Sequence, residues 1–348
     1  MQTIATKVGK PKPTIADIAK VLEVTPSTVS RALNNHPRIS DATRSKVLQV
    51  ARELNYQPNS LAAALRNGHS RVIGVVVPTI NRAFFSNVIF GIEQVAKAAN
   101  YSVIISQSND SEQQEAEALQ TLAQAQVAGV LVSLARNTRQ IDHLQRLLDD
   151  GVPLLLFDRV IDALPVNTIL LDDRAGAYHA VKHLIEQGCR RIAHFTGPNH
   201  LNIYRERVRG YRDALEDHGL AYDPALIRVN DMQQTGGRQS IQELWQAGLI
   251  PDAVFSSSDL AALGAMQWLK EQGIAIPKEV AIVGFANEPL TDLVTPGLSS
   301  VEQYSQQMGE LAAQVFLEQL HAPGKFLGRP PYRRVIAPHL IVRASSLR

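Results

Sequence analysis

TIADIAKVLEVTPSTVSRALN, residues 14–34, has the spacing of two short helices joined by a tight turn. Thr14 can cap the first helix and Thr25 the second, where Pro26 occupies the first turn and its missing N–H costs no hydrogen bond. The two residues left between the predicted helices are too few for a loose loop. The apolar positions are Ile15, Ile18, Ala19 and Leu22 in the first helix and Val29, Ala32 and Leu33 in the second. This stretch therefore predicts a helix-turn-helix unit.

The outward face of the second predicted helix carries short hydrogen-bonding side chains and one cation. These residues are Pro26, Ser27, Thr28, Ser30 and Arg31. Such side chains suit base edges and phosphates in a DNA major groove. The same helix spacing also occurs in ordinary helix pairs of all-α bundles, so the motif alone leaves that alternative open.

A third helix is predicted to begin after Ser40 and to end before Pro58. Asn59 can cap a further Ala-rich run, residues 60–66, of less than two turns. A helix that short is marginal in water because propagation does not recover the cost of nucleation, so it needs a partner to form. Leu65, near its exposed end, fits an apolar wedge pushed between base steps in the minor groove. The apolar set of the third helix is Val47, Val50, Ala51 and Leu54.

Charge is unevenly distributed along the chain. Residues 1–70 hold ten Lys and Arg against four Asp and Glu, whereas the remaining chain holds 25 against 29. The first thirteen residues, with three Lys and no apolar period, are expected to form a flexible basic arm. A basic head on a mildly acidic body indicates a localised contact with a polyanion.

The rest of the chain alternates short apolar strands with helical patterns. At 348 residues and 45% hydrophobic content, it can bury more than one core. Short apolar runs joined by helices indicate parallel sheets covered on both faces, and clefts in such folds open at the carboxyl ends of the strands. The predicted strands are 72–77, 101–105, 129–132, 153–157, 192–195, 253–255 and 280–283.

The whole chain resembles the LacI/GalR family of transcription regulators. The resemblance is carried by TIADIA at 14–19, PSTVSRALN at 26–34 and LNYQPN at 54–59. It implies a sequence-specific DNA-binding regulator, expected to be a repressor, that binds a palindromic operator as a dimer. It further implies a small-molecule effector, a sugar or sugar derivative, held in a cleft of the core.

By the same resemblance, Pro26 and Ser27 enter the major groove and Arg31 supports them. Leu65 matches the hinge-helix leucine that intercalates at the centre of the palindrome. The full set of predicted DNA contacts is Thr14, Thr25, Pro26, Ser27, Thr28, Ser30, Arg31, Asn34, Tyr56, Asn59, Ala62 and Leu65.

The expected fold class is α/β, with a small all-α helix-turn-helix headpiece and a two-lobed core like that of periplasmic binding proteins. The resemblance adds that the chain crosses between two parallel-sheet α/β subdomains three times, near residues 171, 299 and 330. The expected divisions are the arm (1–13), headpiece (14–57), hinge helix and linker (58–70), N-terminal subdomain (71–171 and 300–330) and C-terminal subdomain (172–299 and 331–348).

Candidate effector-binding residues follow the predicted strand ends. Carboxylates and arginine forks around an apolar floor suit a polyhydroxylated or anionic small molecule. By resemblance, Arg207 matches the family arginine that grips the effector, and Asp158 matches another lining position. The predicted effector contacts are Phe84, Phe85, Asp158, Arg159, Arg207, Met232, Ser258, Asp259 and Asn287.

Three departures limit what the resemblance carries over. Ala286 stands where the family often has an aspartate that contacts sugar hydroxyls, and Ser258 replaces a common asparagine. Met232 stands where many members stack an aromatic ring on the ligand, which argues against a flat purine.

Each candidate also has a structural interpretation that the sequence leaves open. Asp158 and Arg159 could form an ion pair, Arg207 could pin a loop, and Asp259 could cap its helix. Phe84 and Phe85 could equally belong to the core, as two adjacent aromatic residues often do.

Catalysis is not expected. Asp172 and Asp173 are unsuited to the convergent acid pair of a glycosidase, because adjacent residues of an extended chain point to opposite faces. Phosphate-binding and nucleophile-elbow motifs are missing from the sequence. His179 and His183 have helical spacing but no evident third ligand, and Cys189, the one cysteine, is expected to be an inert thiol. No catalytic residue, metal site or cofactor is predicted.

A periplasmic sugar-binding protein would share the two-lobed body. However, residues 1–30 lack an apolar signal region, and no stretch approaches the ~18 apolar residues of a membrane span. We therefore expect a cytoplasmic, nucleoid-associated protein. The expected partners are double-stranded operator DNA, a sugar-like effector and a second copy of the chain, with no membrane contact. Some relatives also use a phosphoprotein co-regulator, and the sequence leaves that partner open.

Overall fold

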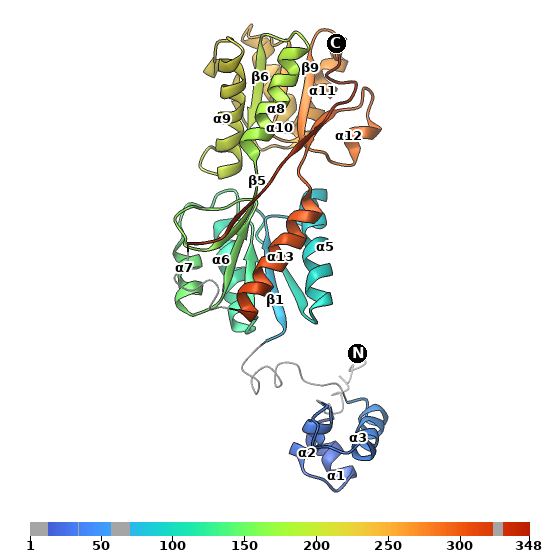
Figure 1. Ribbon diagram of the computed structural model, residues 1–348. Helices are drawn as coiled ribbons and strands as arrows, with labels where there is room; N and C mark the ends of the chain where they lie inside the picture. The colour runs from blue at the N-terminus through green and yellow to red at the C-terminus, as the bar shows by residue number, and fades with distance from the viewer. Residues whose placement is uncertain (1–12, 34, 57–69, 323–329) are drawn as a thin grey trace, which may run out of the picture. The chain divides into compact units, whose positions relative to one another are not determined.

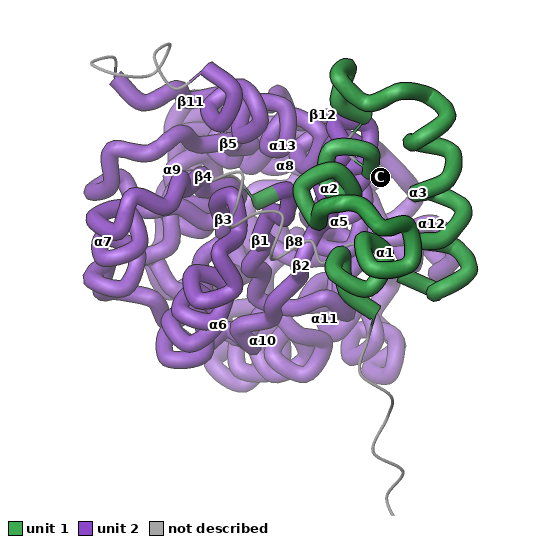
Figure 2. Tube along the Cα trace, turned by 90° about the horizontal axis from the view of Figure 1, so that it is seen from below, with its two compact units in different colours: residues 1–70 green, residues 71–348 purple. Residues whose placement is uncertain are grey.

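The computed structural model describes residues 13–33, 35–56, 70–322 and 330–348. The chain forms two compact units, residues 1–70 and 71–348, which are coloured separately in Figure 2. We call the first unit the headpiece and the second the core, and describe each by itself.

The headpiece contains α1 (Ile15–Val21), α2 (Pro26–Leu33) and α3 (Asp41–Glu53). All three predicted caps are present: Thr14 precedes α1, and the amides of Thr28 and Thr43 donate to the hydroxyls of Thr25 (3.2 Å) and Ser40 (3.3 Å). The buried residues are Ile18, Ala19, Val29, Ala32, Val47, Val50 and Ala51, which confirms the predicted apolar faces.

The third helix ends earlier than the sequence pattern predicted. Asn55 adopts a left-handed conformation (φ 49°), and the amide of Tyr56 donates to the carbonyl of Ala51 at 2.8 Å. An asparagine in this conformation closes a helix without help from a following proline. Pro58 itself lies outside the described residues.

The N-terminal subdomain of the core is a six-stranded parallel sheet in the order β11-β5-β4-β3-β1-β2. Helices α5 (Ala83–Ala98) and α13 (Ser305–His321) lie side by side in this subdomain (Figure 1). Its remaining helices are α6 (Glu112–Gln124) and α7 (Asp142–Asp149). The strands are β1 (Val72–Val77), β2 (Ser102–Gln107), β3 (Gly129–Val132), β4 (Leu154–Phe157), β5 (Asn167–Leu171) and β11 (Arg333–Ile336).

Helices α5 and α13 approach closely because each presents a glycine to the backbone of the other. A Cβ atom on Gly91 would lie 2.2 Å from the carbonyl oxygen of Gln306, and one on Gly309 would lie 2.0 Å from that of Val88. Both distances are far shorter than any van der Waals contact, so neither position tolerates a side chain without moving a helix.

The C-terminal subdomain has a second six-stranded sheet in the order β12-β10-β9-β8-β6-β7. Only β12, at the edge, runs antiparallel to its neighbour, so the predicted parallel sheet is correct apart from one strand. The strands are β6 (Ile192–Thr196), β7 (Ile227–Val229), β8 (Ala253–Ser256), β9 (Ala281–Ala286), β10 (Ser299–Glu302) and β12 (His339–Ile341). The helices are α8 (Asp173–Glu186), α9 (Asn202–Asp217), α10 (Gln234–Gln246), α11 (Asp259–Glu271) and α12 (Leu290–Leu293), with a 3₁₀ turn at Pro224–Leu226.

The chain passes between the two subdomains three times (Figure 1), and two of these crossings lie later than predicted. The first follows β5, at the predicted position. The second follows β10 and precedes α13, so it falls at 303–304 rather than near 299; the third lies between β11 and β12, at 337–338 rather than near 330. Residues 300–302 thus belong to the second sheet and 333–336 to the first. Both misplaced strands have four residues and include polar ones, so no apolar run marked them.

Two further expectations concern single features of the core. Burial raises the pKa of the Cys189 thiol to about 11, so this buried side chain stays protonated near neutral pH, as expected of an inert thiol. Among the described helices, none has both the length and the apolar character needed to cross a membrane.

Candidate effector cleft and DNA-binding surface

A buried polar cleft lies between the two subdomains, and both contribute to its walls. Its cavity volume is about 110 Å³. This is below the range of about 300–1,000 Å³ that ligand pockets usually have, so a ligand the size of a sugar requires the subdomains to open further. The N-terminal wall consists of Thr79, Arg82, Phe84, Phe85, Asp110, Arg136, Asp158 and Arg159; the C-terminal wall consists of Ile203, Tyr204, Arg207, Met232, Gln233, Ser257, Ser258, Phe285, Ala286 and Glu288, with Gln303 in the second crossing.

Seven of the nine predicted effector residues line this cleft. They are Phe84, Phe85, Asp158, Arg159, Arg207, Met232 and Ser258. They come from loops and helix starts that follow β1, β4, β6, β7 and β8, as expected if the cleft opens at the carboxyl ends of the strands.

Phe84 and Phe85 form an apolar corner of the cleft. Their rings meet edge to face with centroids 5.0 Å apart. Phe85 is buried and belongs to the core between the sheet and its helices, whereas Phe84 is half-buried and packs against that core. Both interpretations of the pair therefore apply, because the rings belong to the core and also line the cleft.

Asp158 and Arg159 do not pair with each other. The hydroxyl of Ser133 donates to the Asp158 carboxylate at 3.2 Å, and burial raises the pKa of this carboxyl above its ordinary value. Arg159 instead donates to Asp110 Oδ1 at 2.5 Å, and Arg136 lies 3.0 Å from Asp110 Oδ2. Burial alone would raise the pKa of Asp110, but the two guanidinium groups lower it below its usual range. The predicted ion pair is thus replaced by a carboxylate shared between two arginines.

Arg207 is held on several sides. Its Nη2 lies 2.7 Å from Asp173 Oδ1, its Nη1 donates to the Ser257 carbonyl at 2.8 Å, and its guanidinium lies 3.7 Å from the centroid of the Phe285 ring. Burial raises the pKa of the Asp173 carboxyl, and the Arg207 charge opposes that effect. Arg207 therefore lines the cleft and at the same time pins the loop after β8.

Asp259 and Asn287 are not among the cleft-lining residues, contrary to our prediction. The fully buried Asp259 carboxylate accepts from the Ser300 hydroxyl (2.6 Å) and the Glu288 amide (2.8 Å). The Asn287 side chain donates to Glu302 (2.7 Å) and accepts from Arg343 (2.9 Å). Both residues hold the loop after β9, which brings Ala286 and Glu288 to the cleft, and this is a positioning role.

Several cleft residues were missed by the sequence interpretation. The main ones are Arg82, Asp110, Arg136 and Tyr204. Arg82 lies two residues before Phe84, in the segment PTINRAFF, and its position after a strand is the signal that could have identified it. Asp110 and Arg136 follow β2 and β3 at the same edge of the sheet, but no motif surrounds them.

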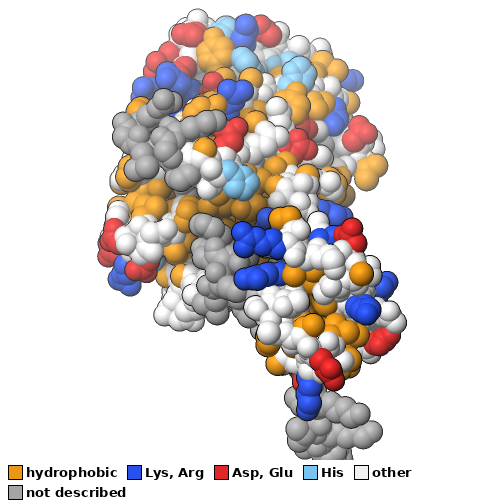
Figure 3. All heavy atoms as spheres, turned by 60° about the horizontal axis from the view of Figure 1, so that its bottom comes forward, with side chains coloured by type: hydrophobic (Ala, Val, Ile, Leu, Met, Phe, Trp, Pro, Cys, Tyr) orange, Lys and Arg blue, Asp and Glu red, His pale blue; other side chains and the backbone are white. Residues whose placement is uncertain are grey.

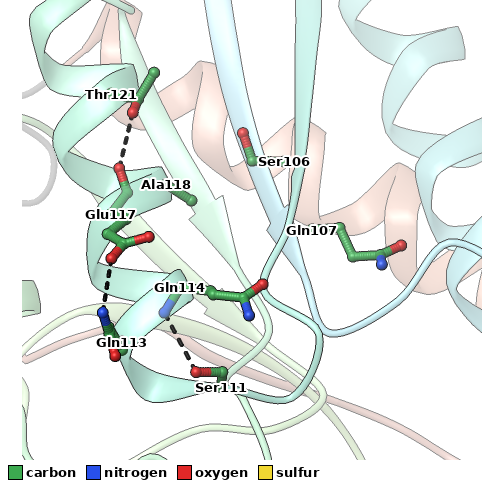
Figure 4. Close-up of a pocket in the computed structure, with 8 residues that line it drawn as sticks. All are labelled: Ser106, Gln107, Ser111, Gln113, Gln114, Glu117, Ala118 and Thr121. Atoms are coloured by element: carbon green, nitrogen blue, oxygen red, sulfur yellow. Dashed lines mark hydrogen bonds between the residues drawn. The ribbon is translucent and has the colours of Figure 1, made fainter.

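A second hollow lies on the outside of the N-terminal subdomain, beside α6 (Figure 4). The stick view shows side chains of α6 opposite Ser106 and Gln107 of β2. The α6 side chains bond within the helix: Gln113 donates to the Glu117 carboxylate at 3.0 Å, and Thr121 to the Glu117 carbonyl at 2.9 Å. This hollow is lined by residues of one subdomain and by no candidate residue, so it does not compete with the cleft.

The headpiece presents the other candidate surface. Pro26, Ser27 and Arg31 on α2 are exposed, whereas Thr28 and Ser30 are half-buried. Basic side chains are visible at the surface of this small helical unit in Figure 3. Thr14 and Thr25 are exposed and Tyr56 packs on the headpiece core; Asn34, Asn59, Ala62 and Leu65 lie outside the described residues.

A helix-turn-helix headpiece joined to a two-lobed core with a buried polar cleft defines a ligand-responsive DNA-binding regulator. Comparison with known proteins is consistent with this class. Residues 14–59 match the model for bacterial regulatory proteins of the lacI family, and residues 181–346 match a periplasmic binding protein-like domain. The chain belongs to the LacI family, and it is a DNA-binding transcriptional repressor with an effector domain rather than an enzyme.

Two relatives illustrate the extent of the similarity. The ribose operon repressor of Haemophilus influenzae is 32% identical over 95% of this chain and 98% of its own. The transcriptional repressor CytR of Escherichia coli is 33% identical over 96% of each.

Two solved structures match over nearly the full chain. The regulator CelR in complex with cellobiose is 29% identical, with a TM-score of 0.73 over 96% of this chain and 99% of that one. The Lac repressor dimer bound to operator and the anti-inducer ONPF is 24% identical, with a TM-score of 0.86 over 97% and 100%, a likeness that concerns the fold alone.

Proposed function

We propose that this repressor binds a palindromic operator as a homodimer and is switched by a sugar or sugar derivative held in the cleft of its core. The observation that carries the proposal is the cleft itself, which is lined by charged and apolar side chains of both subdomains. A ligand in that position touches both subdomains and therefore changes the free energy of their relative orientation.

Direct hydrogen bonds across the cleft support this switching role. The Asn202 side chain accepts from the Val160 amide (2.9 Å) and donates to the Asp158 carbonyl (3.0 Å). His200 Nε2 lies 2.7 Å from the Arg136 carbonyl. These bonds join α9 and its preceding loop to the N-terminal wall of the cleft, so an effector that separates the walls must break them.

Relatives support the chemical class of the effector. One is named a ribose operon repressor, and the structure of another holds cellobiose. One headpiece offers too few base contacts for a genomic search, which favours paired headpieces on a palindrome. A phosphoprotein co-regulator is a further partner to test.

The test is selection of binding sites from a random duplex pool by purified full-length protein at defined salt. We expect an enriched palindrome with a flexible pyrimidine–purine step at its centre, where Leu65 is proposed to intercalate. The variant Leu65→Ala should then lose more affinity for the selected site than for random DNA. Equal losses on both would remove the wedge from the proposal, and enrichment of a single half-site would remove the dimer.

A further inference from the structure

One arginine of the cleft has no counter-ion in contact with it. Within the described residues, the Arg82 side chain makes no hydrogen bond or ion pair. Its guanidinium is half-buried, and burial lowers its pKa, although the nearby Glu288 charge opposes this. A half-buried cation without a bonded partner is unfavourable because its lost hydration is not replaced.

The two neighbouring arginines are also incompletely satisfied. Arg136 and Arg159 share the single carboxylate of Asp110, and the Nε atoms of both are buried without a hydrogen-bond partner in the described part of the chain. Arg159 is only 7% exposed. Across the cleft, the Ser257 hydroxyl is likewise buried and unpartnered. Unused donors therefore come from both walls of the cleft.

The carboxylates of the cleft do not balance this charge. Burial raises the pKa of Asp158, which favours its neutral form, and Arg207 is already paired with Asp173. Among the carboxylates, Glu288 has the strongest electrostatic interaction with Arg82, but burial raises the pKa of Glu288 as well. Three arginines of the N-terminal wall thus face one firmly ionised carboxylate, Asp110.

We infer that the effector is an acidic sugar, whose phosphate or carboxylate group binds Arg82, Arg136 and Arg159 on the N-terminal wall. This inference rests on the proposed function, since it specifies the ligand class of the same cleft. Arginine forks bind such oxyanions through two parallel charge-assisted hydrogen bonds. The rings of Phe84 and Tyr204, which also line the cleft, are left for the carbon skeleton of the sugar.

The Glu288 carboxylate competes with the proposed oxyanion for Arg82. Glu288 comes from the C-terminal wall and lies near Arg82 and the Ala83 amide of the N-terminal wall. An effector oxyanion at Arg82 replaces this interaction between the walls, so its binding is coupled to the arrangement of the subdomains. Removing the Glu288 charge should therefore strengthen oxyanion binding.

The experiment uses full-length protein and inorganic phosphate as a probe that is independent of sugar stereochemistry. Melting temperatures are measured in phosphate and in chloride at equal ionic strength, for the unmodified protein and for Arg82→Met, Glu288→Gln and Arg139→Met. Arg139 is an exposed arginine near Arg136 and serves as the matched control. Phosphate bound elsewhere, including on the basic headpiece, contributes equally to all four proteins.

We expect saturating phosphate to raise the melting temperature of the unmodified protein and of Arg139→Met by about 3–5 °C relative to chloride. Most of that rise should be lost in Arg82→Met, and phosphate should bind several-fold more tightly to Glu288→Gln. Equal phosphate effects in Arg82→Met and the unmodified protein would overturn the inference.

A second measurement separates this inference from the proposed function. Operator release is titrated with neutral sugars, sugar phosphates and sugar acids. Release by a neutral sugar that is unaffected by Arg82→Met would overturn the acidic ligand and leave the sugar switch intact. Arg82-dependent phosphate binding without release by any of the sugars would support the oxyanion site and count against the proposed function. Release by an acidic sugar alone, lost in Arg82→Met, supports both.

Discussion

The two walls of the cleft hold their arginines in opposite ways. On the C-terminal wall, Arg207 is bonded to Asp173 and a carbonyl and lies against an aromatic ring. On the N-terminal wall, Arg82 has no bonded partner within the described residues, and Arg136 and Arg159 share one carboxylate. Arg207 therefore already stabilises the fold, whereas the three arginines of the N-terminal wall have donors left for a ligand. Loss of the effector response is therefore expected to reflect lower stability when Arg207 is substituted, and lost ligand contact when Arg82 is substituted.

The largest expected effect comes from Arg207→Ala. This change leaves the Asp173 carboxylate buried without its partner, which costs about 3–5 kcal/mol of unfolding free energy. Urea denaturation of the full-length protein measures the loss. The double variant Arg207→Met with Asp173→Asn should recover part of it, because no buried charge is then left alone. An Arg207→Ala protein as stable as the original, but unresponsive to effector, would show that the arginine serves the ligand only.

The next effect concerns the pH dependence of stability, through one buried aspartate of each subdomain: Asp259 behind the C-terminal wall and Asp110 in the N-terminal wall. Burial raises the pKa of Asp259 to about 7, so the folded protein holds a proton that the unfolded chain releases near pH 4. Stability from this group therefore falls as the pH rises from about 4 to 7, by about 3 kcal/mol. Denaturation of Asp259→Asn across this range should show a flatter profile. If the slope of stability against pH were unchanged in Asp259→Asn, the pH dependence would come from another group.

Asp110 should have the opposite sign. Its pKa is lowered by the two arginines despite burial, so its contribution is present above the unfolded pKa and is lost as the pH falls through the folded value. Asp110→Asn should destabilise the protein at neutral pH by about 1–3 kcal/mol and remove part of its acid unfolding. If Asp110→Asn did not change the unfolding free energy at pH 7, the shared carboxylate would contribute nothing to stability.

The smallest effect is expected for Arg82→Met in the absence of ligand. Because the Arg82 guanidinium has no bonded partner among the described residues, its removal should leave stability unchanged or raise it by less than about 1 kcal/mol. Melting temperatures of Arg82→Met and Arg207→Ala, measured under the same conditions, compare the two walls directly. A loss as large as that of Arg207→Ala would mean that Arg82 is a structural residue.

The sequence predicts the parts of this molecule whose pattern is local. The caps at Thr14, Thr25 and Ser40 and the apolar strand 72–77 depend on neighbouring residues, and the structure confirms them. Boundaries were less accurate where strands are short and polar, as in RRVI at 333–336, because their pairing is decided by tertiary contacts.

Contacts of the cleft were predictable only where a strand end or the family resemblance identified them. Arg207 and Asp158 were found in this way. The bond between Arg159 and Asp110 joins residues 49 positions apart, and adjacency in sequence suggested the wrong partner, Asp158. Asp259 was misjudged because a carboxylate after a strand looks the same in sequence whether it faces a ligand or a serine behind the wall.

The close contact between α5 and α13 has a consequence for how the protein is made. The N-terminal subdomain begins at β1, but its helix α13 and edge strand β11 are translated only after the whole C-terminal sheet except β12. Until then, apolar residues of α5 such as Val88 and Ile92 have no helix against which to pack. The subdomain that starts first on the ribosome is thus completed almost last, and a chain that terminates before Ser305 would expose this surface to chaperones and proteases.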